Sequence, residues 1–370
     1  MTLVEFWFLV IALLWTGFFV LEGFDFGVGM LHAVVARDEA GRRAAVNTIG
    51  PLWDGNEVWL VVAGAAMFAA FPDWYATMFS GFYLALVILL LALIVRGISF
   101  EYRGKSASAR WRHTWDVLMT AGSLVAPLLI GVALGDLLHG LPIDKAGEYT
   151  GNFVTLLQPY ALYTGVTLVV LCLLHGATFL ALKTTGELRE RSGRIARGVA
   201  PPAALLVVGF AIWTHVTGGK GVLPNPVEVL AILAVLAAAW LISAHREGWA
   251  FAATTLAMAT CILSIFTELY PRVMVSSTNP AYSLTINNAA SGSYALKVMT
   301  VVVIIFFPLV LLYQAWTYYV FRQRLSPGDF RPPALLTRQG PLAKPDGRTP
   351  GAGKPSPAGP ASAADPEGLG

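Results

Sequence analysis

Two pairs of acidic residues lie in or beside apolar sequence. Glu22 and Asp25 are flanked on both sides by apolar residues in FFVLEGFDFGVGML. Asp54 and Glu57 stand at the start of the apolar run that follows GPLWDGNEVW. Residues three apart share a helix face, so each pair points in one direction. A carboxylate near the centre of a membrane helix costs about 2.5–3.5 kcal/mol, and such residues typically belong to ion sites or proton relays.

The second pair also has a structural interpretation. Asp54 as N-cap with Glu57 three residues later resembles a capping box, and Trp53 is typical of a membrane interface. Glu22 and Asp25 have no such explanation, because apolar helix continues on both sides of them. A proton relay or ion site is therefore the favoured interpretation, and neutralisation by Arg, Lys or amide partners stays open.

The neighbours of these acids would shape the site. Gly23 and Gly27 have the spacing that lets a second helix approach closely. Asn56 and Trp53 accompany the second pair. Closely spaced acids in a dry site favour the sharing or passing of protons.

Composition indicates the elements that must position these residues. The 370 residues are 56% hydrophobic and 13% charged, against about 25% charged in soluble proteins. Several apolar runs exceed the roughly 18 residues of a spanning helix. We expect an all-α polytopic membrane protein with nine transmembrane helices, near 4–35, 53–72, 74–98, 115–139, 153–183, 199–217, 227–244, 249–271 and 294–321.

The placement of basic residues predicts the orientation. All Lys and Arg residues apart from Lys145, Lys220, Arg272 and Lys297 count with the segments that follow the odd-numbered spans, with Arg96 and Lys183 at the ends of two of these spans. Basic loops favour the cytoplasmic side, so the N-terminus is expected outside and the C-terminus in the cytoplasm. Both acidic pairs then lie towards the cytoplasm.

Two domains are expected. Residues 1–325 form the transmembrane domain, whose first eight helices would allow two four-helix bundles with the ninth helix peripheral. Residues 326–370 are rich in Pro, Gly and Ala and poor in large apolar residues. Such a segment cannot bury enough surface to offset its ordering entropy, so a disordered cytoplasmic tail is expected.

The remaining candidates favour structural roles. His32 and His175 lie inside apolar runs, and we interpret them as hydrogen-bonded at helix interfaces rather than as haem ligands. Cys172 and Cys261 have no metal or redox spacing, which favours packing. No nucleotide loop, zinc site or hydrolytic triad is recognisable, so no metal site and no nucleic-acid partner are expected.

Three further acids lie near the predicted helix ends. Asp116 and Asp136 flank the fourth span and are expected at the interfaces. Glu268, near the outer end of the eighth span, would pair with Arg272 or line an outer cavity.

Several longer segments closely resemble subunit II of cytochrome bd quinol oxidase. They are EGFDFGVGML, NTIGPLWDGNEVWLVVAGAAMFAAFP, FSGFYLALVILLLALIVRGISFEYRGK, YTGNFVTLLQPYALYTGV, GELRERS, VMVSSTNPAYSLTINNAASGSYALKVMT and LLYQAWTYYVFRQRL. The resemblance extends from about residue 3 to 325, and its specificity comes from the combination of motifs.

The resemblance implies a bacterial plasma-membrane heterodimer that oxidises quinol and reduces dioxygen to water in aerobic respiration. Subunit I would ligate two b-type haems and haem d, so no catalytic residue is expected in this chain. The family's hydrophilic path from the cytoplasm includes acids that match Asp25 and Asp54. A structural quinone and a small single-helix accessory subunit are further partners that the resemblance leaves open, besides membrane lipid.

Two alternatives remain at this point. A proton-coupled transporter would also carry intramembrane acids, but such proteins often have broken helices in both halves. The first span is Gly-rich near Glu22, whereas the fifth and sixth spans have no matching break. In a purely structural scaffold, every acid would be neutralised by a local partner.

Overall fold

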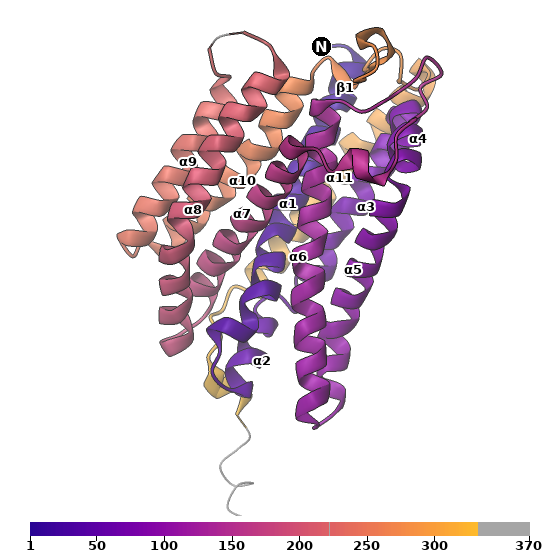
Figure 1. The fold of residues 1–370 in the computed structure, drawn as a ribbon. Helices are drawn as coiled ribbons and strands as arrows, with labels where there is room; N and C mark the ends of the chain where they lie inside the picture. Colours follow the sequence, from indigo (N-terminus) through magenta and orange to yellow (C-terminus); the bar gives the residue numbers. More distant parts are fainter. Residues whose placement is uncertain (222, 332–370) are drawn as a thin grey trace, which may run out of the picture. The chain divides into compact units, whose positions relative to one another are not determined.

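Eleven α-helices form most of the part of the chain that the computed structural model describes, residues 1–221 and 223–331 (Figure 1). A two-stranded antiparallel sheet joins β1 and β2 through the pair Arg272 and Thr285. The elements are α1 (Leu3–Val35), α2 (Glu39–Asn47), α3 (Trp53–Ala70), α4 (Pro72–Gly81), α5 (Tyr83–Tyr102), α6 (Ala109–His139), α7 (Pro159–Lys183), α8 (Gly186–Gly218), α9 (Pro226–Ser243), α10 (Glu247–Leu269), β1 (Arg272–Met274), β2 (Leu284–Thr285) and α11 (Ser293–Val320).

Eight helices in the described ranges are long and apolar enough to cross a membrane, namely α1, α5, α6, α7, α8, α9, α10 and α11. The second predicted span, near 53–72, corresponds to α3. This helix has 18 residues, and its first turns carry Asp54, Asn56 and Glu57, which lower its apolar character. The count of nine spans therefore stays a prediction.

Several helices differ from the sequence prediction. The third span, expected near 74–98, is divided at Phe82 into α4 and α5, and Pro72 occupies the first turn of α4. Helix α8 begins at Gly186 rather than near 199. Its first turns are charged, so hydropathy does not predict them as part of a span. The connection after α1 contains the short helix α2, which the sequence analysis did not anticipate.

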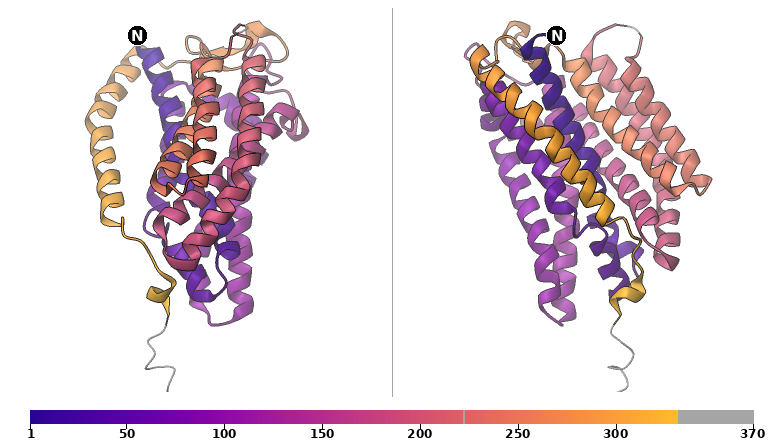
Figure 2. Two further views of the ribbon diagram at one scale, coloured as in Figure 1. Left: turned by 90° about the vertical axis from the view of Figure 1, so that its left-hand side faces the viewer. Right: turned by 180° about the vertical axis from the view of Figure 1, so that it is seen from behind.

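The spans pack as two groups. Helices α1, α3, α5 and α6 form one group through the contacts α1–α3, α5–α6 and α1–α6. Helices α7, α8, α9 and α10 pack against one another in the second group, and α7 joins the groups by packing on α1 and α6. Helix α11 runs across the outside (Figure 2), and only 6% of its apolar span is buried.

The described chain belongs to one compact unit, Met1–Phe330. Its last element is a short 3-10 helix, Pro327–Phe330, which contacts α2. The tail predicted over 326–370 falls mostly on residues 332–370, which lie outside the described residues. Its disorder stays a prediction.

Candidate functional site

Arg96 on α5 lies at the centre of the acidic residues. Its side chain has no exposure, and its Nη1 atom lies 2.5 Å from Glu22 Oε1 on α1. The same nitrogen lies 3.5 Å from Glu57 Oε2 on α3. The rings of Phe26 and Phe100 flank the guanidinium, with its central carbon 4.8 and 5.4 Å from their centroids. One buried cation thus joins acids from two other helices.

Asp25 is the third acid of this cluster. Its side chain is buried, and its Oδ2 atom accepts a hydrogen bond of 2.7 Å from Asn56 Nδ2. Asn56 Oδ1 in turn accepts bonds from Gln314 Nε2 at 2.7 Å and from the Tyr318 hydroxyl at 3.0 Å. Since Gln314 and Tyr318 belong to α11, Asn56 ties this outer helix to the acids. We call Glu22, Asp25, Glu57 and Arg96 the Arg96 cluster.

Close helix packing surrounds the cluster. A Cβ atom on Gly27 would lie 2.7 Å from Gly176 Cα, so α1 and α7 meet back to back at these two glycines. A Cβ on Gly23 would lie 3.1 Å from Met258 Cε and 3.6 Å from Cys172 Sγ. Gly23 and Gly27 therefore lie on a face of α1 against which α7 and α10 pack closely.

Asp54 does not join the Arg96 cluster. Its side chain is exposed, whereas the Glu57 side chain is only 21% exposed. The capping-box alternative is wrong, because the N-cap of α3 is Leu52 and no side chain caps the helix. Trp53 stacks on Phe100, with ring centroids 4.8 Å apart, so it packs beside the cluster.

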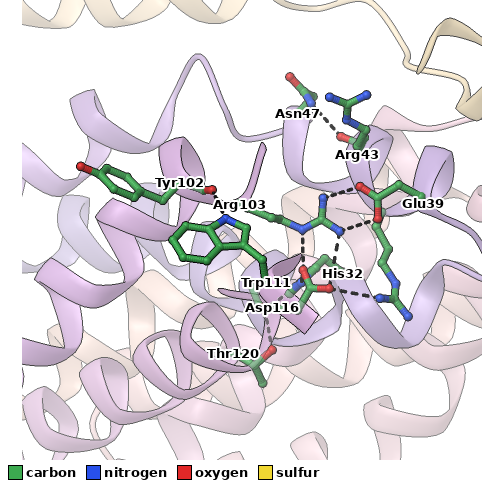
Figure 3. Close-up of polar contacts among 11 residues, drawn as sticks. His32, Glu39, Arg43, Asn47, Tyr102, Arg103, Trp111, Asp116 and Thr120 are labelled. Atoms are coloured by element: carbon green, nitrogen blue, oxygen red, sulfur yellow. Dashed lines mark hydrogen bonds and ion pairs between the residues drawn. The ribbon is translucent and has the colours of Figure 1, made fainter. Parts of the chain in front are cut away.

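A second set of charges surrounds Asp116 on α6 (Figure 3). Its carboxylate accepts a 2.5 Å bond from Arg103 Nε and a 3.1 Å bond from Arg42 Nη1, and it lies 3.1 Å from His32 Nε2. Arg103 also makes a two-pronged contact with Glu39 at 2.7 and 2.9 Å. Asp116 is buried against other helices, with a residue exposure of 3%, and its expected place at the membrane interface stays a prediction. This network fastens α1, α2 and α6 together.

The buried histidines of the described residues do not fit haem ligation. His32 Nδ1 lies 2.8 Å from the Gly29 carbonyl oxygen, and its other ring nitrogen faces Asp116. His175 Nδ1 lies 2.8 Å from Thr254 Oγ1, and its Nε2 lies 3.2 Å from the Val20 carbonyl oxygen. Both nitrogens of each ring are engaged, so neither has a lone pair free for iron. This agrees with the interpretation as hydrogen-bonded interface residues.

The remaining two acids, Asp136 and Glu268, are both buried between helices. Asp136 is fully buried in α6, and neither carboxyl oxygen has a hydrogen-bond partner in the described residues. Glu268 accepts a 3.2 Å bond from Asn225 Nδ2. Within the described ranges it forms no ion pair with Arg272, and it lies instead beside His215 and Glu228.

Arg96 is the member of the cluster that the sequence does not predict. The distribution of basic residues assigns it to a cytoplasmic segment, whereas the structure buries it inside a predicted span. The available signal was its position within LLLALIVRGISF, where a single charge interrupts an apolar run. An intramembrane arginine usually has an acidic partner facing it from another helix.

The fold and the Arg96 cluster define a polytopic membrane protein with charged residues buried between its helices. Residues 3–321 match the family model described as cytochrome bd terminal oxidase subunit II. The chain therefore belongs to this family of bacterial respiratory oxidase subunits, which are multi-pass proteins of the plasma membrane.

Curated relatives cover nearly the whole chain. Cytochrome bd ubiquinol oxidase subunit 2 of Bacillus subtilis (strain 168) is 42% identical over 326 residues, covering 87% of this chain and 96% of the relative. Cytochrome bd-I ubiquinol oxidase subunit 2 of Escherichia coli (strain K12) is 38% identical, with 87% and 95% covered. A chain of the bd oxidase structure from Geobacillus thermodenitrificans has the same fold, with a TM-score of 0.69, 19% identity and 86% and 97% covered.

Proposed function

We propose that this chain is the subunit of a quinol:dioxygen oxidoreductase that does not ligate haem. It would stabilise a haem-bearing subunit I and deliver cytoplasmic protons through the Arg96 cluster. The relatives are named as ubiquinol oxidase subunits, which supports quinol as the electron donor. The two b-type haems and haem d would be held by subunit I and would carry electrons from quinol to dioxygen.

The single observation that carries the proton role is a group of three carboxyl groups, two buried and one partly buried, beside one buried guanidinium. Glu22 and Glu57 contact Arg96, and Asp25 lies three residues after Glu22 on the same helix. One cation cannot balance three carboxylates, and uncompensated buried charge is strongly unfavourable. Protons held among these carboxyl groups reduce the excess negative charge and can move between them.

The differing exposure of the acids supports a direction for the path. Asp54 is exposed, Glu57 is partly exposed, and Glu22 and Asp25 are fully buried. Protons would enter near Asp54, pass to Glu57 and then reach Glu22 and Asp25. The proposed orientation has nine spans with the N-terminus outside. The start of α3 then lies on the cytoplasmic side, from which protons for water formation are taken.

A structural scaffold is the competing function for the same residues, because Arg96 satisfies part of the charge of Glu22 and Glu57. Family membership favours an oxidase subunit over an isolated proton-coupled transporter. The whole complex could also contain a single-helix accessory subunit and a structural quinone. The proposal assigns no residue of this chain to either of them.

The decisive experiment compares Glu57→Gln with Glu101→Gln in the purified oxidase complex. Glu101 is an exposed acid on α5, one helical turn beyond Arg96, and so controls for loss of a carboxylate. Haem content per protein reports assembly, and proton uptake during oxygen reduction is followed with a pH indicator. We expect Glu57→Gln to keep its haems and take up protons more slowly. Normal uptake with full haem content would contradict the relay, and loss of haem would favour the scaffold.

A further inference from the structure

Three residues from three helices of the second group come together at one end of the molecule. They are His215 near the end of α8, Glu228 in the first turn of α9 and Glu268 near the end of α10. A ring nitrogen of the histidine and one oxygen of each glutamate lie within 4.8 Å of one another. This end also carries the N-terminus (Figure 1), so it is the outer end in the orientation proposed above.

Both carboxylates are buried and incompletely bonded. Glu228 and Glu268 are each 1% exposed. Glu228 Oε2 accepts a 2.9 Å bond from the Asn225 backbone and lies 3.2 Å from His215 Nδ1, whereas its Oε1 has no hydrogen-bond partner. Glu268 Oε1 is bonded to Asn225 Nδ2, and its Oε2 likewise lacks a partner. Two unsatisfied oxygens thus lie beside one imidazole.

The backbone leaves room for this arrangement. A Cβ atom on Gly218 would collide with the Glu268 carboxylate, with Glu268 Cδ only 2.9 Å away. Glycine at this position therefore allows the carboxylate to lie against the end of α8. Asn225 donates a hydrogen bond to each glutamate, to Glu228 from its backbone and to Glu268 from its side chain. The carboxylates are consequently positioned by neighbours that leave one oxygen of each free.

Nearby cations do not neutralise the two carboxylates by direct contact. Lys220 Nζ donates instead to the carbonyl oxygens of Thr267 and Tyr270, each at 2.5 Å. Burial lowers the pKa of the Lys220 ammonium, and the neighbouring Glu268 acts in the opposite direction. In the described part of the chain no Lys or Arg forms an ion pair with Glu228 or Glu268. The imidazole of His215 is the basic group that contacts Glu228.

We propose that His215, Glu228 and Glu268 form a site for a divalent transition-metal cation, represented by Zn²⁺. One imidazole and two carboxylates are a common three-residue donor set for zinc, with water completing a tetrahedron. The imidazole disfavours Mg²⁺ and Ca²⁺, which prefer oxygen donors alone. A doubly charged cation balances two buried carboxylates when the histidine is neutral. Bond lengths of about 2.0–2.2 Å require the three side chains to draw slightly closer together.

The site would have a structural effect of its own. Its ligands join the ends of α8, α9 and α10 where the connection between α8 and α9 begins and ends. A bound cation would therefore hold these helix ends together. This effect does not depend on the Arg96 cluster, which lies among α1, α3 and α5.

The test uses the intact oxidase complex, treated with a chelator, dialysed and then titrated with ZnCl₂. We expect wild-type complex to bind one more zinc per haem d than each of the variants His215→Gln, Glu228→Gln and Glu268→Gln. Loss of a metal-ligating side chain should weaken this binding more than about 10-fold, since even outer partners of ligands contribute 10- to 100-fold. His113→Gln is the matched control, because this histidine is exposed near the opposite end of the molecule.

Two results would overturn the proposal. Equal zinc binding by the wild type and the three variants would show that any zinc lies elsewhere, with the triad holding only water or a shared proton. X-ray absorption of zinc-loaded wild-type complex provides a second criterion that needs no variant. We expect a shell of nitrogen and oxygen with one imidazole, and a shell without imidazole would exclude His215 as ligand even if the variants fail to assemble.

Discussion

Arg96 on α5 and Glu22 on α1 form an ion pair of 2.5 Å in which neither side chain has any exposure to solvent. The two helices belong to the same group of spans, yet they are far apart in sequence. The pair therefore depends on the tertiary fold. Variants at Arg96 and Glu22 test the stability of the fold, whereas variants at the exposed Asp54 test proton transfer.

We expect Arg96→Met to destabilise the assembled complex strongly. It removes the only cation of the Arg96 cluster and leaves Glu22 and Glu57 without their partner, and breaking a buried pair costs about 3–5 kcal/mol. The double variant Arg96→Met with Glu22→Met should recover much of this loss, because two apolar side chains often replace a buried ion pair at little cost. Thermal unfolding of the complex and haem content measure both effects. A double variant as unstable as the single one would show that the pair is not the main interaction of Arg96.

Asp54→Asn should leave assembly and haem content unchanged and slow oxygen reduction. The exposed carboxylate makes no helix cap, so its loss removes a proton acceptor without breaking a structural contact. We expect oxygen consumption to fall about 10-fold or more. The usual contribution of a general acid or base is about 100- to 10,000-fold. Oxygen uptake with quinol as donor, normalised to haem d, is the measurement. An unchanged rate would remove Asp54 from the path.

Gly27→Ala should reduce the yield and stability of the complex. The added methyl group would collide with the backbone of α7 at Cys172 and Gly176, and overpacking a tight core costs about 1–3 kcal/mol. Gly198→Ala on α8 is the matched control, since the added Cβ would have no atom within 4 Å beyond its chain neighbours and the backbone of its own helix. The midpoint of thermal unfolding should fall for Gly27→Ala and stay the same or rise slightly for Gly198→Ala. Equal midpoints would contradict the close packing of α1 on α7.

Asn56→Leu should loosen α11. The side chain amide bonds Asp25 on one side and Gln314 and Tyr318 on the other, and leaving buried polar groups unpaired costs about 1–3 kcal/mol each. Hydrogen exchange of the last turns of α11 should increase. Val58→Ala, a change at an exposed neighbour on α3, should leave this exchange unchanged. Equal protection in both variants would show that other contacts hold α11.

Much of the helical organisation could be predicted from apolar periods because a bilayer imposes a minimum span length. The expected ranges 4–35, 227–244 and 294–321 lie within one or two residues of α1, α9 and α11. The predictions were least accurate where polar sequence continues a helix, as in the first turns of α8, or where an apolar run changes direction at Phe82. Hydropathy reports residence in lipid and carries little information on helix length outside it.

The candidate site could be predicted in part. Equal spacing in the pairs Glu22–Asp25 and Asp54–Glu57 indicated a shared face, but spacing does not fix how a helix is rotated relative to its neighbours. That rotation directs Glu57 towards Arg96 and leaves Asp54 exposed. The group of His215, Glu228 and Glu268 was missed for a similar reason, since its members come from three helices and no local spacing connects them.

The position of Arg96 also bears on how the protein is made. Glu22 and Glu57 precede Arg96 in the chain, so both acids have been synthesised when the arginine emerges from the ribosome. An unpaired arginine opposes entry of its helix into lipid by about 2.5–3.5 kcal/mol. The Glu22 carboxylate on α1, which is synthesised earlier, offsets that penalty by pairing with Arg96. The order of the helices along the chain therefore favours insertion of α5 after α1.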